Sequence, residues 1–195
     1  MEIKASDVAK LRQMTGAGMM DCKKALVEAE GDFNRAQEII REKGKLVAAK
    51  RSDRETTEGK VVALVNADNT KAIITALGCE TDFVAKNAEF QELAGNIAKA
   101  ALENFPADLA GLMACSFNGQ TVEDAITQQT GKSGEKHAVP FYASIEAPYI
   151  AAYVHFNKKL GTILGFNKEV SEEIAKQIAM QATAMAPLSI DENDC

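Results

Sequence analysis

Two glycine-containing segments are the parts of this sequence best suited to hold a phosphate group. Gly16-Ala17-Gly18 stands directly before a helical pattern, where free backbone N–H groups can bind an anion. A dinucleotide site also needs a preceding strand and a third glycine, but here a helix precedes and no third glycine follows. Gly131-Lys132-Ser133 is similar to the end of a phosphate-binding loop, yet the first glycine of that motif is replaced by Ile126. We therefore expect a tight turn between helices at the first segment and no direct nucleotide binding at either.

Residues that perform acid–base, nucleophilic or metal chemistry are few and poorly spaced. His137 and His155 lack the spaced cysteine, histidine or aspartate partners that a metal site requires. No Gly-x-Ser-x-Gly motif for a nucleophilic serine occurs, and Glu172-Glu173 falls on a helix face expected to be solvated. The sequence therefore predicts a protein that is not an enzyme, has no catalytic residue, metal or cofactor, and acts through its surface.

The cysteine pattern and the termini favour a reducing compartment. The four cysteines show no Cys-x-x-Cys spacing, and a chain of 195 residues does not need disulfides to fold. The sequence has no charged-then-apolar leader and no apolar run of about 18 residues. We expect reduced thiols, a cytoplasmic location and no membrane contact. Cys195 is expected to be exposed and able to form an adventitious intermolecular bond.

The composition predicts a folded protein that does not bind nucleic acid. Hydrophobic residues make up 46% of the chain, enough to bury the core of one large or two small domains. The net charge is −6 and the isoelectric point is about 5.1, whereas a dedicated DNA or RNA binder normally presents a basic surface. We therefore expect no DNA partner.

The segment 79–87, Cys-Glu-Thr-Asp-Phe-Val-Ala-Lys-Asn, is the strongest candidate for a functional surface. Residues 72–77 are rich in strand formers, and residues 88–102 repeat apolar side chains at helical spacing. Asp82 and Asn87 favour helix starts, so Phe83 falls on the turn between strand and helix. A lone phenylalanine is more often buried than exposed, but this position favours a projecting anchor over a buried plug.

The first 44 residues predict a compact bundle of three short helices. A helix over 7–14 follows the cap residue Ser6, a second covers 19–30, and a third runs from the cap residue Asp32 to about position 43. The residues expected to face the core of the bundle are Val8, Leu11, Met14, Met20, Ala25, Leu26 and Ala29. Between positions 43 and 54 five basic residues occur among acids and without interleaved aromatic residues, which favours an exposed, mobile hinge over an RNA site.

The rest of the chain repeats a hairpin followed by a helix. Strands over 61–65 and 71–77 precede the first helix, and strands over 149–156 and 160–166 precede a second helix that begins near Ser171. Residues 93–98 and 174–179 share the pattern apolar-Ala-x-x-Ile-Ala, an internal repeat. Because an isolated hairpin is marginally stable, each needs its helix as cover, which predicts an α+β fold with two antiparallel sheets.

Three further elements are expected between the two hairpin–helix units. Residues 109–115 predict a short helix or loop, and residues 122–130 predict a helix capped by Thr121. Residues 139–145 have a strand pattern and are expected to pair with the second hairpin.

Two of these segments resemble the signatures of the bacterial elongation factor Ts family. Residues 81–87 are similar to its Thr-Asp-Phe-Val-Ala-(Lys/Arg)-Asn motif, and residues 15–26 are similar to its Thr-Gly-Ala-Gly-Met-Met-Asp-Cys-Lys-Lys-Ala-Leu motif. The resemblance covers nearly the whole chain. It implies a ubiquitin-associated-like helical domain at 1–44, a basic linker at 45–58, a first core subdomain with connecting helices at 59–135, and a second core subdomain at 136–195.

The resemblance also implies which residues contact a partner. Members of this family are nucleotide-exchange factors for the GTPase elongation factor Tu, so the partner implied is elongation factor Tu. The implied contact residues are Met19, Met20, Lys23, Thr81, Asp82, Phe83 and His155. For Met20 a place in the core remains an alternative. The family pattern Ile-Gly-Glu-Asn is poorly kept near Thr130-Gly131, which leaves a contact there in doubt.

The function implied is the release of GDP from elongation factor Tu during translation, by perturbing its Mg²⁺ and phosphate site. The alternatives are an adaptor that binds proteins without exchange activity and an RNA-binding translation protein. Many relatives continue into a coiled-coil hairpin and then complete the second subdomain, so this chain is either truncated or from a lineage with a short form, and we favour truncation. An incomplete sheet would expose an edge or apolar patch, which predicts self-association.

Overall fold

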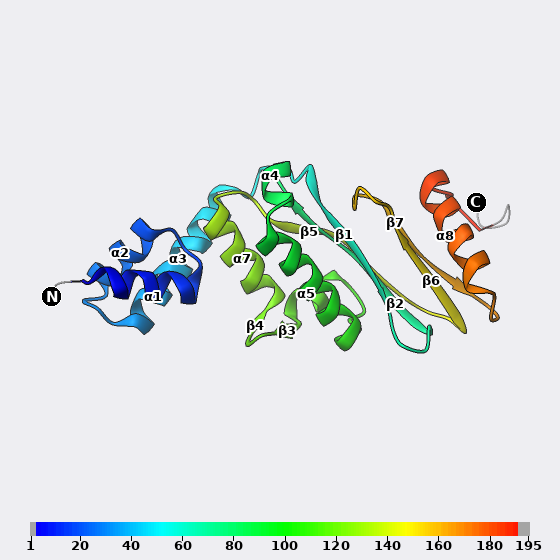
Figure 1. Ribbon diagram of the computed structural model, residues 1–195, viewed down its shortest axis with the longest axis horizontal. Coiled ribbons are helices and arrows are strands. Elements are labelled where there is room, and N and C mark those ends of the chain that lie inside the picture. The colour runs from blue at the N-terminus through cyan, green and yellow to red at the C-terminus, as the bar shows by residue number, and fades with distance from the viewer. Residues whose placement is uncertain (1–2, 191–195) are drawn as a thin grey trace.

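The computed structural model describes residues 3–190, so Cys195 lies outside the described residues. The fold is α+β: three helices at the N-terminal end are followed by antiparallel sheets and further helices (Figure 1). The N-terminal bundle consists of α1 (Ala5–Thr15), α2 (Met19–Glu28) and α3 (Phe33–Lys50). Its core is separate from that of the sheets and includes Leu11, Cys22 and Leu26.

Two methionines expected in the core of the bundle are exposed instead. Met14 is 52% and Met20 is 64% exposed. On α2 the buried side chains include Cys22, Ala25 and Leu26, which follow one another at the three- and four-residue spacing of a single helix face. Met20 lies off this face, so the prediction that it points inward was wrong.

The ends of the bundle helices differ from expectation at two places. Helix α1 begins at Ala5 rather than after Ser6, and the Lys4 N–H donates to Asp7 Oδ2 at 3.3 Å. Helix α3 runs through to Lys50, so residues 45–50 of the expected linker are helical. They contain no glycine or proline to stop a helix. The expected cap Asp32 is confirmed: its Oδ1 accepts the N–H groups of Asn34 and Arg35 at 2.8 and 3.0 Å.

The central sheet has three antiparallel strands in the order β1-β2-β5. They are β1 (Glu58–Val65), β2 (Lys71–Cys79) and β5 (Ala138–Glu146). The prediction that residues 139–145 pair with the second hairpin was wrong, because β5 pairs with β2 of the first. Strands β5 and β2 are each nine residues long, whereas the strands of the second hairpin have six. The longer partner therefore satisfies more backbone groups of β5.

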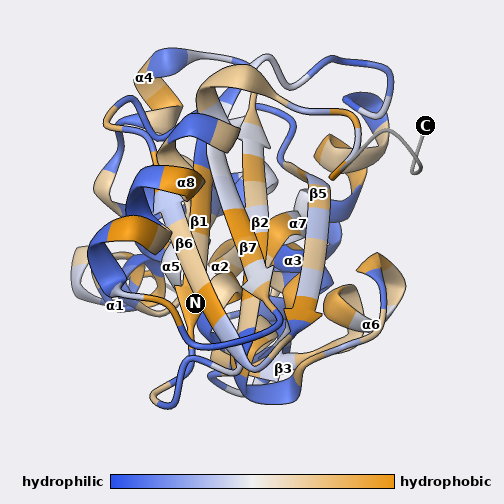
Figure 2. Cartoon of the chain, turned by 90° about the vertical axis from the view of Figure 1, so that its right-hand side faces the viewer, coloured by the Kyte–Doolittle hydropathy of each residue, from blue (hydrophilic) through white to orange (hydrophobic). Residues whose placement is uncertain are grey.

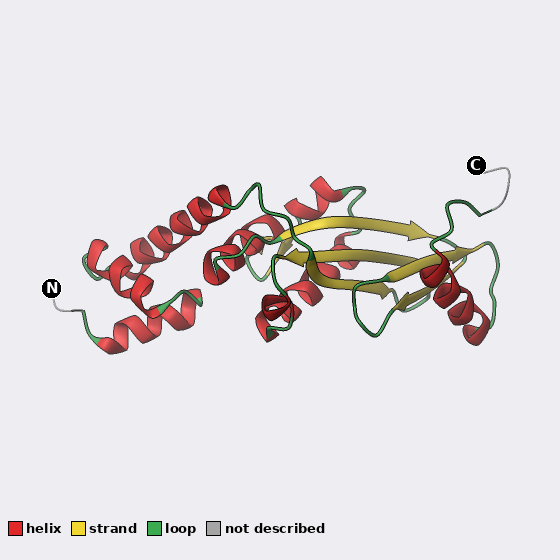
Figure 3. Cartoon of the chain, turned by 90° about the horizontal axis from the view of Figure 1, so that it is seen from above, coloured by secondary structure: helices red, strands yellow, loops and turns green. Residues whose placement is uncertain are grey.

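Helices cover one face of this sheet (Figures 1 and 3). They are α4 (Asp82–Ala85), α5 (Ala88–Asn104), α6 (Leu109–Ala114) and α7 (Val122–Ser133), with a small hairpin of β3 (Ser116–Phe117) and β4 (Gln120–Thr121) before α7. Ile73 and Leu77 from β2 pack with Phe90 and Ile97 from α5 in the main core. The expected cap of α7 is confirmed, since Thr121 Oγ1 accepts the Asp124 N–H at 3.1 Å.

The second hairpin lies on the other face of the sheet. It consists of β6 (Tyr149–Val154) and β7 (Gly161–Phe166), and α8 (Glu172–Met185) covers its outer side (Figures 1 and 2). A methyl group added at Gly161 would come within 3.3 Å of Val61 and Ile74 side chains, which shows how closely the layers meet. The order of layers is helices, sheet, hairpin, helix. None of the helices in residues 3–190 combines the length and the hydrophobicity that a membrane-spanning segment needs.

Candidate protein-binding site

The turn after β2 holds Phe83 at the surface. Strand β2 ends at Cys79, and Thr81 begins the one-turn helix α4, its Oγ1 accepting the Val84 N–H at 3.5 Å. Phe83 is the second residue of that turn and is 83% exposed. Ala85 is the buried residue of the turn. A single helical turn that buries Ala85 turns Phe83 outward, so the ring does not fill its own protein's core.

Hydrogen bonds from two distant segments fix this turn. Thr81 donates its backbone N–H and its hydroxyl to the Glu135 carboxylate, at 3.0 and 2.6 Å. Glu80 accepts Arg51 Nη1 at 3.0 and 3.1 Å and the Lys136 N–H at 2.7 Å. The pKa of Glu80 is lowered, first by the Lys136 N–H and then by the Arg51 charge. The turn is therefore a rigid support, and its partners lie too far along the chain for sequence patterns to reveal them.

Asp82 and the tip of the second hairpin line one groove. Asp82 pairs with Lys86 at 2.6 Å, and this hydrogen bond lowers the pKa of the Asp82 carboxyl group. Opposite them, residues 157–159 of the β6–β7 loop complete a groove of about 350 Å³. His155 lies at the base of that loop, half-buried, with Nδ1 3.0 Å from the Tyr153 hydroxyl. The structure therefore brings the predicted residues Asp82 and His155 to the same end of the molecule.

The predicted contact residues of the N-terminal bundle form a separate patch. Met19 is 44% exposed, and Met20 and Lys23 are also at the surface of α2. Met19 lines a shallow pocket with Glu89 of α5 and Lys132 of α7, so the start of α2 faces the helices that cover the sheet. A partner that contacts both patches must extend from the bundle to the sheet.

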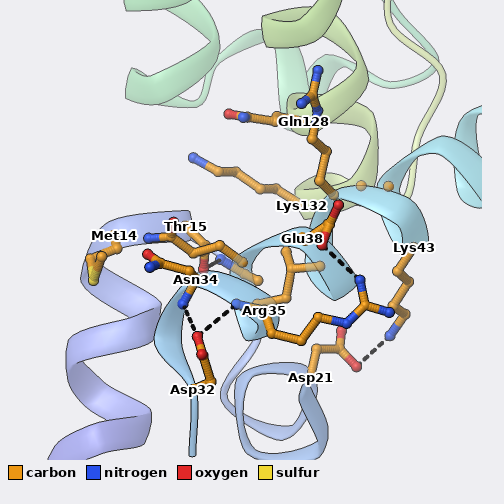
Figure 4. Close-up of a pocket in the computed structure, with 16 residues that line it drawn as sticks. Met14, Thr15, Asp21, Asp32, Asn34, Arg35, Glu38, Lys43, Gln128 and Lys132 are labelled. Atoms are coloured by element: carbon orange, nitrogen blue, oxygen red, sulfur yellow. Dashed lines mark hydrogen bonds and ion pairs between the residues drawn. The ribbon is translucent and has the colours of Figure 1, made fainter. Parts of the chain in front are cut away.

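A cavity between the N-terminal bundle and α7 includes none of the predicted contact residues (Figure 4). It measures about 560 Å³ and is lined by α1, α3 and α7, including Met14 and Lys132. Two ion pairs lie within it, Lys43 with Asp21 and Arg35 with Glu38 at 2.7 Å. Among the described residues no group of three or more histidine, cysteine or acidic side chains is placed to hold a metal ion.

The glycine segments weighed as phosphate sites are helix ends. Gly16 ends α1 in the left-handed conformation, with φ of 68°, and Gly18 is the residue before α2. The expected tight turn is thus confirmed. Gly131-Lys132-Ser133 forms the last turn of α7 rather than the start of a helix, so its backbone N–H groups are not directed at an anion.

Comparison with known proteins identifies the family. The model of the family described as elongation factor TS matches residues 80–195. The elongation factor Ts of Christiangramia forsetii is 50% identical over 193 residues, which cover 98% of this chain and 70% of that protein. The elongation factor Ts of Flavobacterium psychrophilum is 47% identical over 97% of this chain and 69% of its own.

The Bacteroides fragilis elongation factor Ts is 50% identical over 99% of this chain, which spans 58% of that longer protein. Similarity at this level extends through both the bundle and the sheets, and it includes the turn that carries Phe83. The chain therefore belongs to the elongation factor Ts family, the nucleotide-exchange factors for elongation factor Tu.

Proposed function

We propose that this chain binds elongation factor Tu·GDP, perturbs its Mg²⁺ and phosphate site, and promotes GDP release during translation elongation. The single observation that carries the proposal is the 83% exposure of Phe83 on a turn fixed by Glu80 and Thr81. An exposed ring on a rigid support can enter a partner with little loss of its own conformational freedom. A cytoplasmic location accompanies this function.

The physical basis of exchange is the coupling of two binding events. We consider an exchange factor that binds elongation factor Tu only when the Mg²⁺ and phosphate site is disturbed. Such a factor lowers the affinity of elongation factor Tu for GDP, and GDP lowers the affinity of elongation factor Tu for the exchange factor by the same ratio. Each tenfold change corresponds to about 1.4 kcal/mol of coupling free energy. The step makes and breaks no covalent bond, so it requires no catalytic residue.

We assign the two surface patches different roles. Phe83, with Thr81 and Asp82, enters between helices of the GTPase domain, and His155 contacts the same domain. Met19, Met20 and Lys23 orient the complex from the bundle, where flexible methionine side chains adapt to a partner surface.

The finer description of the fold belongs to the same proposal. The bundle at 1–44 is ubiquitin-associated-like, 45–58 connects it to the core, and 59–135 and 136–195 are two core subdomains. The order β1, β2, α5 followed by β6, β7, α8 supports two related hairpin–helix units. Strand β5 falls after position 135 yet pairs with β2, so the two subdomains share a sheet.

The experiment is to measure the release of a fluorescent GDP analogue from elongation factor Tu with and without the protein. Phe83→Ala is expected to reduce stimulated release roughly 30-fold, because a buried aromatic anchor commonly contributes about 2 kcal/mol. Phe141→Ala is the matched control, since Phe141 is a 54% exposed phenylalanine on the edge strand β5. Near-normal stimulation by a folded Phe83→Ala protein would overturn the role of Phe83.

The same measurement separates exchange from simple binding. An adaptor without exchange activity would bind elongation factor Tu·GDP while leaving the rate of GDP release unchanged. Binding and release are therefore measured in the same samples, and a wild-type chain that binds without accelerating release would refute the exchange function.

A further inference from the structure

The loop between β6 and β7 carries a second exposed aromatic ring. The strand pattern runs to Phe156, but β6 ends at Val154. The loop closes where the Lys158 N–H donates to the His155 carbonyl at 2.8 Å, and Lys158 has a left-handed φ of 58°. Asn157 Oδ1 accepts the Lys159 N–H at 3.0 Å. Asn157, Lys158 and Lys159 thus form the turn. The Phe156 side chain makes no contribution to the turn geometry.

Phe156 is the most exposed phenylalanine of the chain. All eight phenylalanines fall within the described residues; Phe156 is 85% exposed, Phe83 is 83%, and Phe141 follows at 54%. The Phe156 ring contacts the His155 ring, with centroids 4.4 Å apart. This contact places the ring against a half-buried histidine while leaving most of the ring surface in water. A ring exposed to this degree contributes little to folding and is free to contact a partner.

The loop that carries Phe156 is attached to the sheet. The Val61 N–H donates to the Lys158 carbonyl at 2.7 Å, and Lys159 pairs with Glu58 at 2.8 Å. Both bonds join the hairpin tip to β1, so the tip is held in place on the central sheet. Phe156 therefore has a firm support, as Phe83 has.

The residues next to the two exposed rings line one groove. Asp82, directly before Phe83, lines one side, and Asn157, directly after Phe156, lines the other. The groove contains both charges, from Asp82 and Lys86 on one side and from residues 158–159 and Glu58 on the other. A partner surface that receives Phe83 and extends across this groove meets the second ring.

We propose that Phe156 is a second aromatic anchor for elongation factor Tu, which enters an apolar depression of the surface that also receives Phe83. The inference rests on the proposed function, because it assigns a further contact to the same interface. Two anchors on separate supports fix the orientation of the partner better than one. Rings that are already held in place lose little conformational entropy on binding.

The test compares affinities of full-length variants for elongation factor Tu·GDP by titration calorimetry. Phe156→Ala is expected to weaken binding about tenfold, in the range common for buried aromatic contacts. Phe156→Leu, which keeps an apolar side chain, is expected to recover part of this loss, and Phe141→Ala to retain wild-type affinity. In a His155→Ala background Phe156→Ala is expected to weaken binding further, because the ring contacts the partner itself rather than positioning His155.

A failed role of Phe156 and a failed binding of elongation factor Tu give different results in this test. Wild-type affinity of Phe156→Ala together with weak binding by Phe83→Ala would overturn the second anchor and leave the proposed function intact. An equal loss in Phe141→Ala, or no further loss in the His155→Ala background, would also overturn it. A wild-type chain that fails to bind would refute both. Should the alanine variant lose its fold by circular dichroism, Phe156→Asn supplies the same test, since asparagine favours turns.

Discussion

Arg51 at the end of α3 donates Nη1 to both carboxylate oxygens of Glu80, at 3.1 and 3.0 Å. Glu80 directly precedes Thr81, the residue that begins the α4 turn. The ion pair thus connects the last residues of the N-terminal bundle to the turn that presents Phe83. Lys136 strengthens the same junction, because its ammonium group donates to the Ser52 carbonyl at 2.6 Å.

Arg51→Ala is expected to reduce stimulated GDP release by up to about fivefold while leaving the fold intact. The Arg51 side chain is 37% and that of Glu80 16% exposed, and a partly exposed ion pair contributes about 0.2–1 kcal/mol. Loss of the pair frees the turn from the end of α3, while its hydrogen bonds with the Lys136 N–H and with Glu135 remain. The control is Arg35→Ala, which removes an exposed pair with Glu38 within α3. Equal rates for the two variants would show that the Arg51–Glu80 pair does not support Phe83.

Gly131→Ala is expected to lower the free energy of unfolding by about 1–3 kcal/mol, as overpacked contacts do. A methyl group at Gly131 would lie 2.7 Å from the Gly44 Cα. Because that atom belongs to the backbone of α3, the helices α3 and α7 would have to separate. Urea unfolding of the variant measures the change.

Gly95→Ala is the matched control for Gly131→Ala. Gly95 also lies within a helix, α5, but apart from the backbone of that helix and its chain neighbours no atom lies within 4 Å of the place its methyl group would occupy. We expect this variant to be more stable than the wild type by about 0.5–1 kcal/mol, because alanine favours the helix. Equal destabilisation by both variants would mean that the α3–α7 contact is not the cause.

Local patterns predicted the elements of the fold better than their pairing. The first hairpin, the helix α5 and its cap Asn87 follow from apolar spacing and from residues that start helices. The strand with which β5 pairs cannot be predicted from these patterns, because both hairpins offer a free edge. The choice between them depends on strand length and packing. The continuation of α3 through residues 45–50 was hidden for a related reason: the basic side chains suggested a linker, although each of those residues is compatible with a helix.

The candidate site could be predicted only where neighbouring residues in the sequence indicate a turn. Asp82 and Asn87 placed Phe83 on a turn, and the structure has that turn at the surface. Glu135, which accepts both hydrogen bonds from Thr81, lies 54 residues further along the chain and has no sequence signal. The exposure of Phe156 could not be predicted, because Phe156 is the last residue of a strand pattern. Only Asn157, the next residue, indicates that the strand ends before Phe156.

Self-association is expected through apolar side chains on α8 and the residues after it. Ile174 and Ile178 are 52% and 42% exposed, and Leu188 and Ile190 are almost fully exposed. Figure 2 views the molecule from this end and shows hydrophobic segments along α8. Sedimentation velocity is expected to show a mass that rises with concentration, and Ile178→Lys to reduce the rise. Lys176→Ala on the same helix is the control, and a mass that is monomeric at all concentrations would refute the expectation.

His137 is expected to make stability fall as the pH drops below 6.5. The residue is 5% exposed; its Nδ1 donates to the Glu135 carbonyl at 2.9 Å, and Nε2 has no hydrogen-bond partner in the described part of the chain. The ring lies against Phe90, with centroids 5.6 Å apart. Burial lowers the pKa of His137 below its ordinary value of 6.5, although Glu135 and Glu80 act in the opposite direction.

The direction in which the free energy of unfolding changes with pH follows from the number of protons that His137 binds in the folded and unfolded states. Below pH 6.5 the unfolded chain binds a proton that the folded chain excludes, so the free energy of unfolding falls by up to about 1.4 kcal/mol per pH unit until the folded state also titrates. Urea unfolding between pH 7.5 and about 5, above the range in which most carboxylates titrate, measures this slope. His137→Asn is expected to be less stable at neutral pH but to lose the slope. His155→Asn removes the other histidine and is expected to keep it; a slope that persists in His137→Asn would assign the pH dependence to another group.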